Sequence, residues 1–570
     1  MRKLNQRRAY RGMTKEQAEA AHARHRQVLS VLAGLLLVQF LGMLANTIVS
    51  NAMPVIVAEI GGTTTHFAWI LTSGIIANTV MTALSGKLAD LYDKKALFIA
   101  SMLIFCIGSV ACGFAQSPGQ LIAFRVLQGM GMGMQVMLSM VIMATIIPPR
   151  ERGRYNGYMG ASLALATVSG PLIGGLIVDT SWLGWRWCFW AMIPFMLGAI
   201  FVIIRRLHVP PVRTGKVHLD LAGAGLIMAI AVSLLLWVSL IGTHVEFTDP
   251  VSLALIAIFL LALPAFIFVE AKSPEPLIPL DILLHRNTVL AIIATIGTGT
   301  IMFGANVFLG QYFQYGRGYS PTAAGLLTLP MMLGVTISST WIGQLITHKG
   351  VWKRYVVGGM FLLTAGSAAL CFARQDTNLV LLGVCFFAIG WGLGSSMQNL
   401  VLAVQNTVPL DQMGAATSTV TFFRNFGGAL GIQVLGAAYT NASHDYMIAR
   451  LGSLPKVPTG SAGSLDLAAL PDPVETVARA SFGNTLWSVF LTSTILLFAG
   501  FIATIAMKGS ALRDTVDLQV AKALDEDTDS GREGAGKGAG GRTATESEEK
   551  AESPGEKTEG SEDKGRSGQG

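Results

Sequence analysis

Charged residues are scarce in this chain of 570 residues. Asp, Glu, Lys and Arg together make up 13 %, about half the share that soluble domains usually carry. Apolar residues make up 52 %, and the mean hydropathy is +0.54. A water-soluble core cannot hide so large an apolar surplus, so most of the chain must face lipid or other lipid-embedded helices. This composition excludes a cytosolic enzyme, a nucleic-acid-binding protein and a secreted disulfide-bonded scaffold.

Clusters of chemically reactive residues are missing as well. The five cysteines form no CxxC pair and lie within or beside apolar runs, which is typical of small buried side chains. The sequence contains no GxxxxGK[ST] phosphate loop, which argues against ATP as the energy source. It also contains no metal-ligand cluster, Ser/His/Asp set or buried carboxylate pair. We therefore predict no catalytic residue, no metal and no cofactor.

Long runs without Asp, Glu, Lys or Arg are the main feature that the sequence does contain. About 20 apolar residues span the hydrocarbon core of a membrane as a helix. We identify fourteen runs and predict fourteen transmembrane helices, the thirteenth interrupted only by Arg424. The runs are 27–58, 60–86, 96–124, 126–149, 155–178, 187–204, 221–245, 250–269, 287–316, 318–348, 355–373, 377–410, 412–444 and 480–507.

Loop charge predicts how these helices are oriented. With the basic arm 1–27 in the cytosol, the inner loops carry 15 Lys and Arg and the outer loops carry 6, as the positive-inside rule requires. We predict a multi-pass plasma-membrane protein with both termini in the cytosol. The outer loop 441–482 is either a mobile loop or a small ordered cap. The tail 509–570 is rich in Gly, Ser, Glu and Lys and is predicted to be disordered.

The chain contains an internal repeat. Six matches fall at an offset of 261 residues, and one further match falls at an offset of 257, which aligns Gly86 with Gly343. The six are Gly129, Gly131 and Gly133 with Gly390, Gly392 and Gly394, Pro148 with Pro409, Gly153 with Gly414, and Gly170 with Gly431. Repeated halves are typical of transporters that rock two bundles about a central site. We predict six helices (28–206), two extra helices (219–270) and six helices (287–507).

A charged motif lies between the second and third predicted helices. It reads Gly86-Lys-Leu-Ala-Asp90-Leu-Tyr-Asp-Lys94-Lys95. Gly86 lets helices approach closely, and Asp90 can pair with a cation or cap the N-terminus of a neighbouring helix. Such a cluster can latch the cytosolic side shut.

Three further motifs lie inside predicted helices. Arg125-Val-Leu-Gln128-Gly-Met-Gly-Met-Gly places a lone arginine in the membrane, where it should face the interior and find a partner. Gly170-Pro171-Leu-Ile-Gly174-Gly175 gives a helix with a bend and a flat glycine face for close packing. The last motif covers residues 44–54 of the first helix, Leu-Ala-Asn-Thr-Ile-Val-Ser-Asn-Ala-Met-Pro.

These motifs resemble motif A, motif B, the antiporter motif and the first-helix motif of the major facilitator superfamily. Within it they are similar to the fourteen-helix drug:proton antiporters of the QacA/EmrB type. The resemblance implies an all-α integral membrane protein with the major facilitator fold, two six-helix bundles and two extra central helices. It also implies a secondary transporter that exports hydrophobic or amphiphilic drugs and antibiotics by alternating access, coupled to protons. Such relatives commonly carry Asp where this chain has Ala45, so no proton-binding carboxylate is assigned there.

The predicted membrane interior offers amides and two arginines. We predict that the proton and substrate pathway includes Asn46, Asn51, Arg125, Gln128, Gln398, Asn399 and Arg424. Asp90 and Asp179 are candidates for the titrating group. An adaptable apolar pocket could be shaped by Trp69, Phe303, Phe308, Trp391 and Phe422. With two arginines and no first-helix carboxylate, the cavity is expected to favour neutral or anionic amphiphiles over dications.

Three functions remain open at this point. Proton-driven export of small hydrophobic compounds is the first, and export of a lipid or an endogenous metabolite, aided by the loop 441–482, is the second. A membrane receptor or scaffold without transport is the third, and the antiporter motif and the repeat argue against it. The expected partners are a small hydrophobic substrate, protons and membrane lipids, with no nucleic acid, and the expected state is a monomer.

Overall fold

The computed structural model describes residues 15–62, 64–180, 183–207, 221–240, 247–273, 280–319, 321–409, 412–452 and 471–512. These described residues are almost entirely helical and belong to one compact unit that covers Met1–Leu518. In chain order the helices are α2 (Lys15–Glu59), α3 (Thr64–Leu91), α4 (Lys94–Gly113), α5 (Pro118–Ile146), α6 (Pro149–Asp179), α7 (Trp187–Trp190), α8 (Ile193–Arg206), α9 (Leu221–Leu240), α10 (Pro250–Lys272), α11 (Leu280–Leu284), α12 (Arg286–Gln311), the π-helix η1 (Tyr312–Gly316), α13 (Pro321–Leu327), α14 (Leu329–Lys349), α15 (Lys353–Leu370), α16 (Leu379–Gln405), α17 (Met413–Leu451), α18 (Asp472–Asn484) and α19 (Leu486–Ala506).

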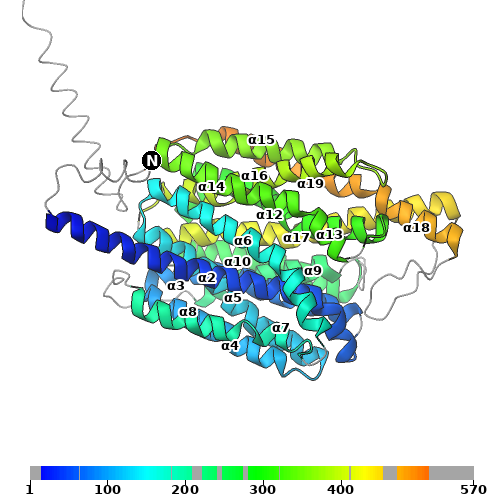
Figure 1. The fold of residues 1–570 in the computed structure, drawn as a ribbon, viewed down its shortest axis with the longest axis horizontal. Helices are drawn as coiled ribbons and strands as arrows, with labels where there is room; N and C mark the ends of the chain where they lie inside the picture. Colours follow the sequence, from blue (N-terminus) through cyan, green and yellow to red (C-terminus); the bar gives the residue numbers. More distant parts are fainter. Residues whose placement is uncertain are drawn as a thin grey trace, which may run out of the picture. The chain divides into compact units, whose positions relative to one another are not determined.

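The long helices lie side by side (Figure 1). Each of the fourteen predicted runs overlaps a helix or consecutive helices of this set, although the run 96–124 continues beyond the end of α4 into the start of α5. Within the described residues, ten helical segments are long and apolar enough to cross a membrane, and α9 adds a shorter apolar stretch, Ala222–Val238. Large apolar side chains remain exposed on the outside, such as Leu261 at 72 %, as expected for a lipid-facing surface. The predicted all-helical membrane fold is confirmed, whereas the number of fourteen crossings stays a prediction.

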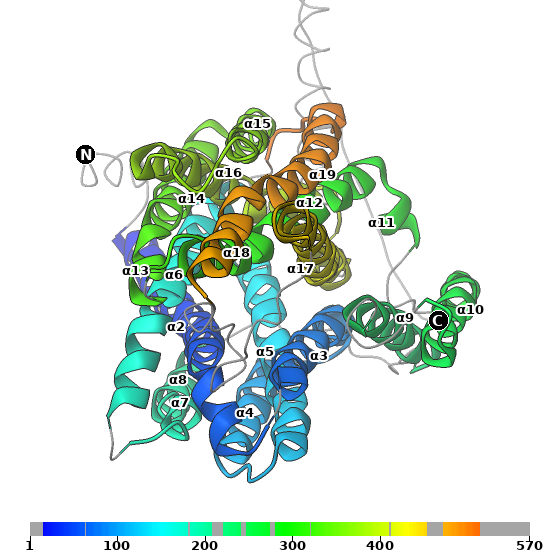
Figure 2. The same cartoon turned by 90° about the vertical axis from the view of Figure 1, so that its right-hand side faces the viewer.

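The main bundle has two separate hydrophobic cores. One is built from α2 to α8 and contains Leu41, Ile48 and Phe98; the other is built mainly from α11 to α19 and contains Phe313 and Val356. Figure 2 looks along the helices and shows α3, α4, α5 and α8 on one side and α12, α14, α15, α16 and α19 on the other. Two cores are what two repeated bundles require, because each bundle buries its own apolar faces.

The glycines of the repeat occupy equivalent places in the two bundles. A Cβ added to Gly129 or Gly133 of α5 would strike backbone carbonyls of α3, and one added to Gly131 would strike α4. In the second bundle, Gly390 and Gly394 of α16 meet α14 in the same way, while Gly392 meets α15. The alternating glycines therefore let α5 and α16 each pack closely between two neighbouring helices, because no side chain of α5 or α16 stands in the way at these positions.

The two extra helices form a hairpin beside the main bundle. Ile227, Ala231 and Leu235 of α9 share a small core with Ile76 of α3 and Phe422 of α17. Figure 2 shows α10 on the far side of α9 from α3. The helix α9 thus packs where α3 of the first bundle and α17 of the second lie side by side.

The predicted N-terminal arm and the predicted outer loop are partly helical, whereas the described start of the predicted tail, 509–512, is not helical. The helix α2 begins at Lys15 within the predicted arm, residues 1–14 lie outside the described residues, and the predicted tail is described only as far as Leu512. In the loop 441–482, α17 continues to Leu451 and α18 begins at Asp472, while residues 453–470 lie outside the described residues. The described parts of that loop are therefore ordered helix.

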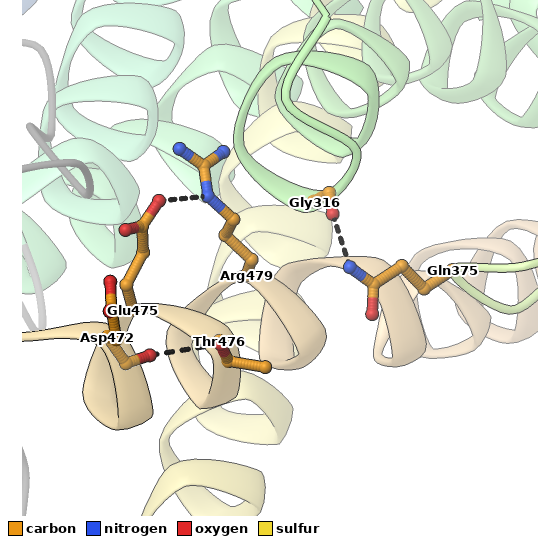
Figure 3. Close-up of polar contacts among 6 residues, drawn as sticks. All are labelled: Gly316, Gln375, Asp472, Glu475, Thr476 and Arg479. Carbon is orange, nitrogen blue, oxygen red and sulfur yellow. Dashed lines mark hydrogen bonds and ion pairs between the residues drawn. The ribbon is translucent and has the colours of Figure 1, made fainter.

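The helix α18 is fixed against η1 and α17 by several contacts. The Tyr439 hydroxyl donates to the Phe482 carbonyl at 2.7 Å, and Gly316 packs against Gly483. Figure 3 shows two neighbouring contacts: Gln375 Nε2, from the segment after α15, donates to the Gly316 carbonyl of η1 at 2.8 Å, and Arg479 Nε pairs with Glu475 Oε1 within α18 at 2.6 Å. We call this end of the bundle the α18 end, and the end where α3 stops and α17 begins the Asp90 end.

Candidate functional site

A cavity lies between the two bundles. Residues of α2, α3, α5 and α6 line it from the first bundle, and residues of α12, α14, α16 and α17 line it from the second. About 160 Å³ is open to the centres of water-sized molecules. Seven of its 28 lining residues are methionines and none of the 28 carries a carboxylate. The wall is therefore apolar and pliable, with amides and two arginines as its main polar groups.

Arg125, buried at 4 % exposure, is held in this wall by neutral oxygens. Its guanidinium donates to Gln128 Oε1 at 2.7 Å, to Asn46 Oδ1 at 3.2 Å and to the Ile70 carbonyl at 3.4 Å. Gln128 is fixed in turn, because its Nε2 donates to Ser109 Oγ at 2.8 Å. These hydrogen bonds link α2, α3, α4 and α5, and they give Arg125 the interior position and the partners that the sequence led us to expect.

Arg424, the second arginine of the wall, is buried at 3 % exposure. Its Nε and Nη1 atoms have no hydrogen-bond partner among the described residues. Its own backbone carbonyl packs tightly against Gly299 of α12, which holds α17 close to α12. Arg424 and Arg125 are thus equally buried but differently satisfied.

The other predicted pathway residues divide into two groups. Asn46 and Gln398 line the cavity, and Phe303 also lines it among the five predicted aromatic residues. Asn399 is buried outside the lining, where its Nδ2 donates to the Ser395 carbonyl at 2.8 Å. The side chains of Asn51 and of the candidate Asp179 lie outside the described residues.

Asp90 joins the two bundles at the Asp90 end. Its Oδ1 accepts from the Gly414 amide and its Oδ2 from the Ala415 amide, both at 2.9 Å. These amides belong to the first turn of α17, where unpaired N–H groups and the helix dipole favour a carboxylate. Gly86 and Gly414 pack so closely that a Cβ on either would strike the carbonyl of the other. Asp90 therefore caps the N-terminus of α17, which is one of the two roles predicted for it.

A second crossing of the same kind joins α6 to α14. Gly153 and Gly343 pack on each other through their backbones, and Thr347 Oγ1 accepts from the Arg154 amide at 3.1 Å. Gly343 is the repeat counterpart of Gly86, and Gly153 is that of Gly414. Thr347, at the offset of 257 from Asp90, was not among the predicted site residues, although the repeat contained the signal.

Arg152 is a second residue that the sequence reasoning missed. It is fully buried, and its Nε donates to the Ile147 carbonyl at 2.7 Å while its Nη1 donates to Gln405 Oε1 of α16 at 3.2 Å. It also approaches the sulfur of Met413, its own counterpart at the offset of 261. Loop charge suggested only a topological role, because burial between the bundles leaves no mark in local composition.

The remaining motif residues serve local packing. A Cβ on Gly170 would collide with Thr47 of α2, and Gly174 faces the Ile48 carbonyl, so the antiporter motif holds α6 on the first helix. The side chain of Pro171 and the surroundings of Gly175 lie outside the described residues. Of the basic pair, Lys94 is buried at 8 %, whereas Lys95 Nζ donates to the Ile204 carbonyl of α8 at 2.7 Å.

Comparison with known proteins agrees with this architecture. The family model of the Major Facilitator Superfamily matches residues 35–432. The multidrug transporter protein MdtP of Bacillus subtilis is 31 % identical over 505 residues, which cover 84 % of this chain and 92 % of MdtP. Multidrug resistance protein 3 of the same organism is 32 % identical over 446 residues, 78 % of this chain and 85 % of that protein.

A solved structure gives the same fold. The proton:xylose symporter XylE, bound to 6-bromo-6-deoxy-D-glucose, matches with a TM-score of 0.58 and 13 % identity. The match covers 87 % of this chain and 99 % of that chain. At this identity the likeness concerns the fold alone.

Proposed function

The chain belongs to the major facilitator superfamily, and on that premise we propose that it exports hydrophobic and amphiphilic drugs in exchange for protons. The observation that carries the proposal is the methionine-rich cavity that both bundles line. Methionine side chains adapt to ligands of different shape. Relatives named as multidrug transporters support the same function.

In this mechanism the bundles rock about the cavity. The α3–α17 and α6–α14 crossings close the Asp90 end, and both must separate before the cavity opens there. Loop charge supports a cytosolic position for the Asp90 end and for both termini. The proposal places the protein in the plasma membrane as a monomer.

Proton coupling in this proposal acts through the latch. Asp90 accepts two hydrogen bonds as a carboxylate. A protonated carboxyl group accepts more weakly and loses its favourable interaction with the start of α17. Proton binding at Asp90 therefore loosens the α3–α17 crossing and favours the state that is open at that end.

Everted membrane vesicles test the proposed function. Vesicles that contain the protein should accumulate a hydrophobic fluorescent dye when respiration builds a proton gradient, and vesicles from cells without the gene should not. An uncoupler should abolish the difference. Accumulation that survives the uncoupler would exclude proton-driven export. Failure of every hydrophobic dye, with the protein present in the membrane, would instead favour a lipid or an endogenous metabolite as substrate.

A further inference from the structure

The two arginines of the cavity wall differ in one decisive respect. Arg125 has three neutral oxygens within hydrogen-bond distance, contributed by Gln128, Asn46 and Ile70. Arg424 is as deeply buried, yet its Nε and Nη1 have no acceptor in the described part of the chain. A buried guanidinium without acceptors is costly, because the protein has removed its water without replacing the lost hydrogen bonds.

The position of Arg424 indicates where an acceptor would come from. It lies eleven residues after Met413, the first residue of α17, about 16 Å along the helix from the Asp90 end. It lines the cavity, and no carboxylate is among the described lining residues. A ligand in the cavity could therefore supply the missing acceptor.

The wall around Arg424 fits the rest of such a ligand. Gln398 on the neighbouring helix α16 also lines the cavity, and its Nε2 has no partner among the described residues, so it offers a second donor. Phe303, Met331 and Met332 give an apolar surface on α12 and α14. The counterpart of Arg424 in the first half is Leu163, which lines the cavity too, so the wall of the first bundle has no donor at the equivalent position.

We propose that Arg424 binds the anionic group of amphiphilic substrates, a carboxylate or a sulfonate, while their apolar body lies against Phe303 and the methionines. The planar fork of a guanidinium matches the two oxygens of such a group in a bidentate pair. Arg125 is a weaker competitor for the ligand, because each of its three nitrogens already donates a hydrogen bond within the first bundle. The inference names a substrate class for the proposed exporter, and ligand binding tests it without relying on transport.

A matched pair of probes isolates the charge. 8-Anilinonaphthalene-1-sulfonate and N-phenyl-1-naphthylamine share one aromatic body and differ in the sulfonate. Their affinities would be measured with the purified full chain in nanodiscs of phosphatidylcholine, with empty discs as the blank. The wild type should bind the sulfonate more tightly. Arg424→Gln should weaken sulfonate binding by roughly 10-fold to 100-fold, because a hydrogen-bonded charge is lost, and should change binding of the neutral probe by less than about 2-fold.

Two further variants control for charge and for folding. Arg424→Lys keeps the charge without the fork and should give an intermediate loss for the sulfonate. Arg125→Gln should not change the ratio of the two affinities, since that side chain is held by protein oxygens. Equal weakening of both probes by Arg424→Gln, no weakening of either, or the same selective loss in Arg125→Gln would each overturn the assignment. The neutral probe reports in every sample whether the cavity is still folded.

The anion could come from a soluble amphiphile or from a lipid headgroup. Adding phosphatidylglycerol to the discs separates these sources. If it lowers the apparent affinity for the sulfonate in the wild type but not in Arg424→Gln, a lipid also occupies the site; if it has no effect, the site takes the soluble amphiphile. If the vesicle assay shows no efflux, the proposed export is contradicted, whereas the binding of anionic ligands at Arg424 is still decided by the nanodisc measurements.

Discussion

The α3–α17 and α6–α14 crossings are built alike in their backbones and differently in their side chains. At both, two glycines remove the side chains so that backbones touch, and a polar side chain accepts from an amide of the neighbouring helix. At the first crossing that acceptor is the Asp90 carboxylate, which also takes a second amide. At the second crossing it is the neutral hydroxyl of Thr347. The two halves of the repeat thus share the close glycine contact but differ in the charge of the accepting side chain.

This difference predicts unequal contributions to closure. A hydrogen bond to a charged group stabilises by about 1.5–3 kcal/mol, and a neutral one by about 0.5–1.5 kcal/mol. The dipole of α17 adds to the carboxylate side alone. The α3–α17 crossing should therefore hold most of the polar closing energy, while the steric demand is the same at both crossings.

The largest effect is expected from filling the glycine contacts. Gly86→Val should prevent the Asp90 end from closing, because the added carbons overlap the Gly414 carbonyl and the Ser418 side chain. Overpacking of this kind costs about 1–3 kcal/mol or more, so efflux in everted vesicles should fall at least about 10-fold. Gly343→Val should match it. Gly198→Val in α8, where a Cβ meets nothing within 4 Å, should leave efflux unchanged; a clear difference between the first two would show that the crossings are not sterically equivalent.

A smaller effect is expected from removing the charge at the first crossing. Asp90→Asn keeps the shape of the side chain but replaces one acceptor oxygen by a donor. The closed state should lose about 1–2 kcal/mol relative to the open state, which lowers the ratio of closed to open molecules roughly 5-fold to 30-fold. Double electron–electron resonance between spin labels at the exposed residues Tyr92 and Lys349 would measure it, in a background without the five native cysteines. An unchanged distance distribution would contradict the latch role of Asp90.

The smallest effect is expected at the second crossing. Thr347→Val removes one neutral acceptor from the Arg154 amide, so the closed population should fall by roughly 2-fold to 10-fold. The same spin-label pair gives the comparison directly. If Thr347→Val opened the Asp90 end more than Asp90→Asn does, the charge difference between the crossings would not govern closure.

Much of this architecture could be predicted from the sequence because it depends on local signals. Runs without charge gave the helices, and the spacing of Gly129, Gly131 and Gly133 gave both the repeat and the close packing. Capping a neighbouring helix was one of two roles predicted for Asp90, but its target at Gly414 depends on how two distant helices meet. The burial of Arg152 and the lack of an acceptor at Arg424 also arise from packing between bundles. Gln398 and Asn399 are adjacent in sequence, and the turn of α16 decides which one reaches the cavity.

The helix α17 is one uninterrupted rod of 39 residues, about 58 Å long and nearly twice the thickness of a hydrocarbon core. Its first turn is held by Asp90, its first third carries Arg424, and its far part rests on α18 through Tyr439. A stiff lever cannot move at one end only. Any tilt that frees the first turn shifts the arginine and displaces the projecting tip in the same stroke.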